Sequence, residues 1–331
     1  MSRLVIVVTS PRVAGGLLSA QAWSACNAGP VCLTEATGDH AVALAAAGVD
    51  VHRLDPHLSV DATVAGVRAR AHSQETVAVL VGGDRDQDLV AALRDRDGVP
   101  DDFATVDIVD GSWDLPGAHL LDVVSTMDRL RSPGGCPWDA EQDHLSLAPY
   151  LLEEAYEAFQ MIEDGDLRGL RDEIGDVLLQ VAFHARLAEE LPAGQQWSID
   201  DVADGLVRKL VRRHPHVFAD VEVGGASEVN AHWEEIKAAE RAGASPLASV
   251  PLAAPALTLT ATLQRKARRA GIEVLAAAPE DALAAFRALP SVDTAGELLW
   301  ALAGWMQACG IDPETALRQR ARDFRNRALE D

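Results

Sequence analysis

The hydrophobic pattern near the N-terminus predicts short strands that alternate with amphipathic helices. Runs of β-branched and other apolar residues at 4–8, 77–81 and 103–109 are typical of buried strands. Apolar positions at helical spacing predict helices near 60–71 and 86–95. Because strands and helices alternate along this part of the chain, we expect a small α/β domain built on a parallel sheet.

After this region the apolar spacing becomes that of long helices. In the stretch 146–163, for example, Leu152, Phe159 and Ile162 fall on one stripe of a helix. Pro215 forbids continuation of the helix that precedes it. The predicted helices cover 120–131, 146–163, 167–190, 199–213, 228–242 and most of 255–331.

Two segments rich in turn-forming residues divide the chain. The first is DLPG at 114–117, and the second contains the two prolines of the stretch 245–251. We therefore expect a mainly α protein with three domains. They are a small α/β domain at 1–116, an all-α helical-bundle domain at 117–244 and a second helical domain at 245–331.

Charge, apolar runs and cysteine spacing exclude several kinds of partner and indicate where the protein is located. The 331 residues carry a formal net charge of −22, which repels a nucleic-acid backbone, so we expect no nucleic-acid polymer as a partner. The apolar run at 4–8 is too short for a membrane helix or a signal peptide. We expect no membrane association and a cytoplasmic location. The cysteines lack the spacing of a zinc site and are expected to be reduced packing residues: Cys26, Cys32, Cys136 and Cys309.

Four carboxylates are arranged symmetrically about a predicted turn. Because the two long helices join around Gly165, residues equally distant from it lie at about the same height. Glu157 is then level with Glu173, and Glu154 with Asp176. The two members of each helix are spaced i, i+3 and share one helical face. We expect the four side chains to converge on one small space.

Converging carboxylates favour a metal site. Four like charges would repel one another strongly if they were dehydrated and had no cations between them. Oxygen ligands with no histidine or thiolate nearby favour Mg²⁺, with Mn²⁺ as the other candidate. Taken singly, each acid is better explained as a solvated residue of an amphipathic helix. Their symmetry about one turn favours the metal interpretation for the set.

The sequence around these acids resembles the MazG-type all-α nucleoside triphosphate pyrophosphohydrolases. Glu153 opens the pattern E-E-x-x-E, which is followed after fifteen residues by E-x-x-D ending at Asp176. The resemblance runs from about 119 to 242. Several blocks agree in order and spacing: GCPWD at 135–139, LLEE at 151–154, EIGDVLLQV at 173–181 and RHPHVF at 213–218.

The resemblance implies hydrolysis of a nucleoside triphosphate between its α and β phosphates, with release of a nucleoside monophosphate and diphosphate. It also implies that four of the acids are magnesium ligands: Glu154, Glu157, Glu173 and Asp176. From its position at i, i+4 from Glu157, Glu153 either orients the attacking water or a second cation or is simply a solvated residue of the helix surface. Homodimerisation into a four-helix core is also expected, because the hairpin carries apolar stripes and the family suggests it.

Basic and aromatic residues supply candidate contacts to the substrate. Lys209, Arg212 and Arg213 share one helical face, and the family places such a helix on the β and γ phosphates. The alternative is a solvated basic face. Two tryptophans could stack on a base, although core packing is the commoner role, and a lysine lies one turn after the second: Trp138, Trp233 and Lys237.

The C-terminal domain resembles a second copy that has lost its ligands. The run GELL at 296–299 echoes GDVL at 175–178. Thr294 stands where Glu173 would recur, Ala284 replaces a glutamate, and Asp323 takes the position of Lys209. We expect a degenerate, non-catalytic repeat.

At the other end, the Gly-Gly-Asp turn at 82–84 lacks a Gly-Lys-Ser/Thr sequence and is expected to be a strand-to-helix turn. The order of strand, Gly-Asp turn and helix faintly resembles part of the tetrapyrrole methylases. We expect a vestigial domain without methyl-transfer activity.

Other classes fit less well. A ferritin-like di-metal oxidase needs Glu-x-x-His on its helices, whereas the fourth positions here are Glu157 and Asp176. The chain contains no His-Asp dipeptide, which the HD phosphohydrolases require. The remaining alternative is a non-catalytic module for helical dimerisation or regulatory nucleotide binding.

Overall fold

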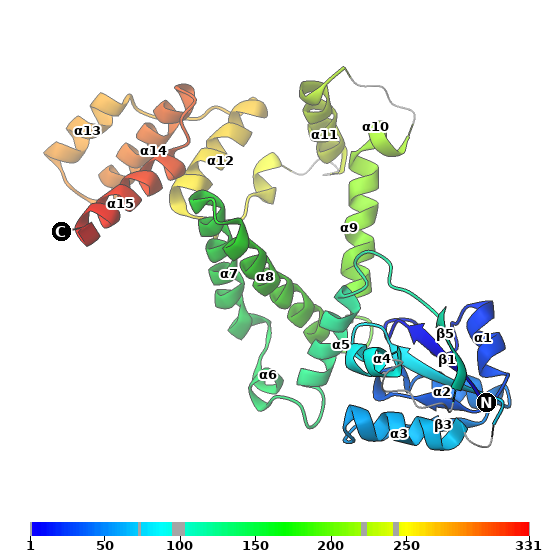
Figure 1. Cartoon of the computed structure of the whole chain (residues 1–331). Helices are drawn as coiled ribbons and strands as arrows, with labels where there is room; N and C mark the ends of the chain where they lie inside the picture. Colours follow the sequence, from blue (N-terminus) through cyan, green and yellow to red (C-terminus); the bar gives the residue numbers. More distant parts are fainter. Residues whose placement is uncertain (1, 72–73, 95–102, 220–223, 241–244, 331) are drawn as a thin grey trace. The chain divides into compact units, whose positions relative to one another are not determined.

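The computed structural model describes residues 2–71, 74–94, 103–219, 224–240 and 245–330 (Figure 1). These residues are mainly α-helical and include one small sheet. The chain divides into two compact units, Met1–Ala203 and Asp204–Asp331. The division falls inside helix α9, which spans Ile199–Arg213. The predicted boundaries of the three domains remain predictions.

The first unit begins with a five-stranded parallel sheet of order β3-β2-β4-β1-β5. The strands predicted at 4–8, 77–81 and 103–109 are confirmed as β1, β4 and β5. Strands β2 and β3 have only three residues each and are not predicted by the hydrophobic pattern. The strand bounds are Ser2–Thr9 (β1), Val31–Leu33 (β2), Val51–Arg53 (β3), Thr76–Gly82 (β4) and Phe103–Asp110 (β5).

Helices cover both faces of the sheet. Successive side chains of β1 point to opposite faces, and because they are apolar on both, each face needs a covering layer. Leu4 and Ile6 pack with residues of α3 and α4 on one face. Val5 and Val7 point the other way and pack with residues of α1 and α2. The predicted α/β domain is therefore present. Its helices are α1 (Ala20–Cys26), α2 (His40–Ala46), α3 (Val60–Ala71) and α4 (Gln87–Arg94), with a short 3₁₀ turn at Glu35–Thr37.

A buried arginine occupies the carboxyl end of this sheet. The Arg12 side chain is only 4% exposed, and its Nε donates to the Asp122 carboxylate at 2.7 Å. Its two other guanidinium nitrogens pair with Asp84 and Asp114. The pKa values of Asp84 and Asp122 lie below the usual range because both carboxylates accept hydrogen bonds from Arg12. The turn at 82–84 thus leads from β4 to α4, and its aspartate binds a side chain of the chain itself.

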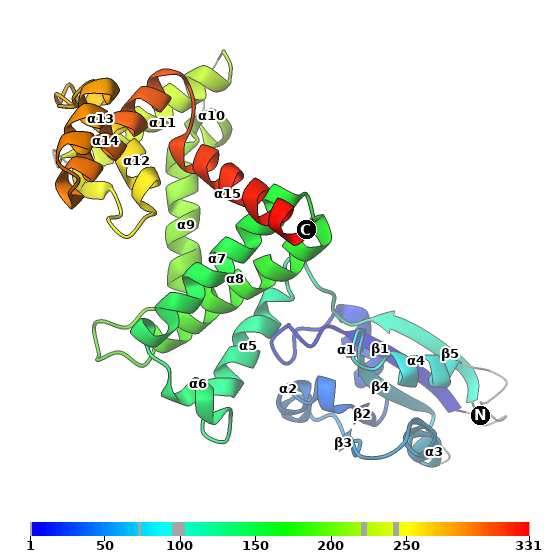
Figure 2. The same ribbon diagram turned by 90° about the vertical axis from the view of Figure 1, so that its left-hand side faces the viewer.

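Four helices complete the part of the first unit that carries the acids. Helices α7 and α8 lie side by side in both views (Figures 1 and 2). Met127 of α5 packs with Leu147 of α7 and with Phe183 and Leu187 of α8. The loop predicted at 132–139 ends in a short helix, α6. The helices are α5 (Leu120–Arg131), α6 (Pro137–Glu141), α7 (His144–Asp164) and α8 (Leu167–Ala188).

The hairpin between α7 and α8 has clear sequence determinants. Asp143 and Ser146 form a capping box that starts α7. Gly165 ends α7 with φ of 71°, a left-handed conformation that glycine adopts without strain. The Asp166 side chain then accepts hydrogen bonds from the backbone N–H groups of Arg168 and Gly169 and starts α8. The turn that the sequence analysis placed around Gly165 is confirmed.

The second unit consists of helices. Among them, α13 and α14 form a hairpin, and α14 begins with a capping box at Ser291. The helices after α9 are α10 (Pro215–Phe218), α11 (Ala226–Glu240), α12 (Ala256–Arg269), α13 (Pro279–Ala288), α14 (Val292–Ala308) and α15 (Pro313–Glu330), with a 3₁₀ turn η2 at Pro246–Ser249. The predicted helix ends at 95, 242 and 331 lie outside the described residues. No helix in the described part of the chain is long and apolar enough to cross a membrane.

Candidate metal centre

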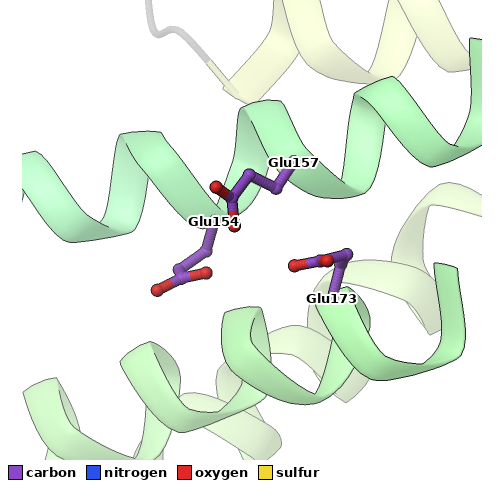
Figure 3. A group of neighbouring side chains, drawn as sticks. All are labelled: Glu154, Glu157 and Glu173. Atoms are coloured by element: carbon purple, nitrogen blue, oxygen red, sulfur yellow. The ribbon is translucent and has the colours of Figure 1, made fainter. Parts of the chain in front are cut away.

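Three glutamates from the two arms of the hairpin meet in the space between the helices. Glu154 and Glu157 come from α7 and Glu173 from α8. One carboxylate oxygen from each can be chosen so that all three lie within 4.8 Å of one another. Figure 3 shows the three side chains reaching toward the gap between the helices. Among the described residues, no other group of three or more acidic, histidine or cysteine side chains is so arranged.

The other two predicted acids lie beside this group. Asp176 and Glu153 are both exposed and do not belong to the set of three. Asp176 projects from the same face of α8 as Glu173, but its side chain is one methylene shorter than that of a glutamate. Its charge still acts on the group, because it raises the pKa values of Glu154 and Glu173. Glu153 also raises the pKa of Glu154.

The environment disfavours the charged forms of two of the three glutamates. Partial burial, then the charges of Asp176 and Glu157, raises the pKa of Glu154 above its ordinary value. The pKa of Glu173 is raised by the same effects, with Glu157 the first charge after burial. The largest causes of both shifts are burial and neighbouring carboxylates, all of which raise the pKa. A cation between the carboxylates would therefore relieve this repulsion.

The donor set fits a hard divalent cation. Carboxylate oxygens are the ligands that Mg²⁺ and Mn²⁺ prefer, and the three glutamates supply only such oxygens. The carboxylates are held by the two helices α7 and α8. The turn at Gly165 determines which residues of α7 lie beside which residues of α8. An acidic group able to hold a divalent metal ion is thus part of the hairpin.

The predicted phosphate-binding residues belong to the second unit. Lys209 is exposed on α9. Arg212 and Arg213 form ion pairs with Glu240 of α11 at 2.8 and 2.5 Å. The hydrogen bonds from Arg213 and then Arg212 lower the pKa of Glu240 to about 2, so this carboxylate is charged at neutral pH. Glu240 is not among the residues predicted from sequence, because nothing in its local sequence marks it as a partner of α9.

The two tryptophans differ in surroundings. Trp138 is 50% exposed and lies edge-on to Tyr150, with ring centroids 6.1 Å apart. Trp233 is partly buried and lies edge-on to His214, at 5.0 Å. The Trp233 indole N–H is buried and has no hydrogen-bond partner among the described residues. Lys237 is partly buried one turn further along α11. Trp138 thus offers an accessible ring, whereas Trp233 packs on a histidine.

Comparison with known proteins identifies the family. A model described as the MazG nucleotide pyrophosphohydrolase domain matches residues 142–218, a segment that contains the whole hairpin. A protein of Thermotoga maritima, named nucleoside triphosphate pyrophosphohydrolase/pyrophosphatase MazG, is 36% identical over 219 residues, which are 63% of this chain and 83% of that protein. These matches and the carboxylate hairpin define a helical protein of the nucleotide pyrophosphohydrolase type. The chain belongs to the MazG family.

Other relatives match to different extents. An uncharacterised 26.1 kDa protein in the blaB 3′ region of Streptomyces cacaoi is 46% identical over 226 residues, which are 68% of this chain and 87% of that protein. A nucleoside triphosphate pyrophosphohydrolase of Mycolicibacterium smegmatis is 49% identical over 160 residues, and the chain spans about half of its length, 48%. The crystal structure of a mazG-related protein from Thermotoga maritima aligns with a TM-score of 0.30 at 25% identity, over 36% of this chain and 97% of that one.

Proposed function

We propose that this chain hydrolyses nucleoside triphosphates between the α and β phosphates, releasing a nucleoside monophosphate and diphosphate. The observation that carries the proposal is the group formed by Glu154, Glu157 and Glu173 inside the segment that matches the family model. The names of the relatives from Thermotoga maritima and Mycolicibacterium smegmatis support the same reaction. In that reaction water attacks the α-phosphorus. The bond between the α-phosphorus and the oxygen that bridges it to the β-phosphorus breaks, and that oxygen leaves with the diphosphate.

The metal proposed for this centre is Mg²⁺, with Mn²⁺ able to replace it. Glu154, Glu157 and Glu173 would hold it, joined by Asp176 from the same face of α8. Bound Mg²⁺ would supply positive charge to the phosphate oxygens and make a water molecule more acidic. Glu153 is exposed on α7 directly before Glu154, and it would orient the attacking water and accept its proton.

Binding of the substrate is proposed to use the basic and aromatic residues of the matched region. Lys209, Arg212 and Arg213 would contact the β and γ phosphates, since guanidinium and ammonium groups bind phosphoryl oxygens through charge-assisted hydrogen bonds. Trp138 would stack on the base, because half of its surface is accessible. Trp233 and Lys237 would contribute from α11. The proposed location is the cytoplasm.

Product analysis tests this function. The full chain, incubated with Mg²⁺ and a panel of ribo- and deoxyribonucleoside triphosphates, should yield monophosphate and diphosphate in equal amounts. Nucleoside diphosphate and inorganic phosphate would contradict the proposed cleavage site. An absence of turnover with every member of the panel would favour a module for dimerisation or regulatory binding.

We also propose that two copies of the chain pair through the hairpin. Large apolar side chains on α7 are exposed in the single chain, among them Leu152 at 55% and Ile162 at 59%. On α8 Ile174 is 53% exposed. An apolar surface of this kind is stabilised when a second copy buries it, and a dimer would turn two hairpins into a four-helix core.

Light scattering tests the pairing. One copy of the chain has a mass of 35.2 kDa, and the protein in solution should have twice that mass. Ile162→Glu should return it to a single copy, because a charge would enter the buried interface. Ile311→Glu is the matched control, since Ile311 is 50% exposed but lies outside the hairpin, and it should stay dimeric. A wild-type chain that keeps the single-copy mass at micromolar concentration would contradict the proposal.

A further inference from the structure

Helix α15 has an apolar stripe that stays exposed in the described part of the chain. The helix packs on α12 and α14 along another side, where Arg318 and Arg322 are partly buried. On the stripe, Leu317 is 59% exposed and Phe324 is 64% exposed. The stripe consists of Leu317, Ala321, Phe324 and Ala328. An apolar face of this kind is stabilised when another apolar surface covers it.

The spacing of the stripe is that of a coiled-coil seam. Its members are four, three and four residues apart, which places Leu317 and Phe324 at the d positions of a heptad and the two alanines at a positions. Small side chains at a leave holes that a large side chain of a facing helix can fill. The helix has 18 residues, so the seam is short, and a contact of this size is typical of a weak, transient association.

Arginines occupy every position beside this seam. The e positions hold Arg318 and Arg325, and the g positions hold Arg320 and Arg327. Arg318 pairs with Glu314 of the same helix at 3.2 Å. The other three arginines are exposed. Because the e and g residues of two paired helices face each other, their charges determine which partner a helix accepts.

Charge then selects among the possible partners of α15. Two copies of this helix would place arginine against arginine, which disfavours pairing with itself. A nucleic acid would be repelled by the chain as a whole, whose net charge is −22. A lipid bilayer needs a broader apolar face than one leucine, one phenylalanine and two alanines provide. A helix with carboxylates on both sides of its own apolar stripe fits best, since a guanidinium binds a carboxylate through two parallel hydrogen bonds.

We propose that α15 docks an acidic amphipathic helix of another protein. The two apolar stripes face each other, and carboxylates of the partner pair with the exposed arginines of α15. Burial of Leu317 and Phe324 supplies the affinity, and the arginines supply the specificity and the rate of association. Binding weakens as salt is added, because the paired charges are exposed. The contact involves none of the residues proposed for hydrolysis, so either proposal can fail without the other.

Fluorescence anisotropy with labelled synthetic peptides tests the docking. One peptide is a helix of about three heptads with leucine at a and d and glutamate at e and g, and a matched peptide carries lysine at e and g. The full chain should bind the acidic peptide at least about tenfold more tightly than the basic one. The net charge of −22 favours the opposite order, so a preference for the acidic peptide isolates the effect of α15.

Truncation of the stripe should weaken this binding. Phe324→Ala removes the largest apolar side chain of the stripe and should weaken binding of the acidic peptide about tenfold. Leu289→Ala is the matched control, since Leu289 is 68% exposed but lies outside α15, and it should bind as the wild type does. Both positions are exposed, so neither change disturbs the packing of the second unit.

Reversal of charge at the g positions gives a second test. The double variant Arg320→Glu, Arg327→Glu should lose the acidic peptide and bind the basic one. Its control, Arg269→Glu with Arg287→Glu, makes the same change in net charge at exposed arginines of α12 and α13 and should keep the wild-type preference.

Three results would overturn the proposal. The first is that the wild type fails to bind the acidic peptide at millimolar concentration or binds both peptides equally well. The second is that the charge-reversed variant keeps the wild-type preference. The third is binding to anionic lipid vesicles, or self-association, that Phe324→Ala abolishes and the acidic peptide does not compete with; it would assign α15 to a membrane or to a second copy of the chain.

Discussion

Glu157→Gln should lower the turnover number by more than about 100-fold while the chain stays folded, because loss of even an outer partner of a metal ligand costs about 10–100-fold. The substitution removes one of the three carboxylates that meet within 4.8 Å and leaves the size of the side chain almost unchanged. Since Glu157 is exposed, its replacement disturbs little packing. Steady-state hydrolysis of the preferred nucleotide measures the effect.

A control on the same helix separates this effect from a general loss of charge. Glu163 is also an exposed glutamate of α7 but does not belong to the carboxylate group, so Glu163→Gln should keep near wild-type turnover. In EDTA, Glu157→Gln should melt no lower than the wild type, because it relieves repulsion from Glu154 and Glu173. Turnover of Glu157→Gln within a few-fold of wild type would remove Glu157 from the centre.

Removal of divalent metal should abolish hydrolysis, and added Mg²⁺ should restore it. The carboxylates repel one another without a cation, and after burial this repulsion is the next cause of the raised pKa values of Glu154 and Glu173. A cation that binds only the folded chain stabilises it by mass action, so millimolar Mg²⁺ should raise the melting temperature by a few degrees. Activity assays and thermal melts in EDTA, with and without excess Mg²⁺, measure both effects.

The melting experiment has its own control. Glu157→Gln should lose most of the rise that Mg²⁺ produces, whereas Glu163→Gln should keep it. Sodium chloride at equal ionic strength should not reproduce the rise in the wild type, because screening alone places no cation between the carboxylates. Full hydrolysis in EDTA, or an equal rise for both variants, would argue against a metal centre in the hairpin.

The hairpin could be predicted from sequence because its determinants are local. Helical spacing marks the two long helices, and Gly165 supplies the left-handed residue that ends the first one. The number of residues between an acid and Gly165 gives its position along the hairpin. Glu157 and Glu173 are each eight residues from Gly165, so their proximity could be predicted from sequence. Position along the hairpin does not show how far each side chain extends toward the other helix. The Asp176 side chain is one methylene shorter than that of a glutamate and lies outside the group of three.

The features that sequence analysis missed depend on residues far apart in the chain. Strands β2 and β3 have three residues each and exist through pairing in the sheet, so no periodic run marks them. Arg12 binds three aspartates that follow it by 72 to 110 positions. Glu240 likewise pairs with Arg212 and Arg213 of α9 only in the folded second unit. Local patterns carry no information about such contacts.

The central claim is that a water molecule attacks the α-phosphorus of a nucleoside triphosphate. Hydrolysis in water enriched in ¹⁸O, followed by mass spectrometry of the products, tests it most directly. We predict that the label appears in the nucleoside monophosphate and that the diphosphate released with it carries none. Label in diphosphate or in inorganic phosphate, with an unlabelled nucleotide product, would contradict the claim.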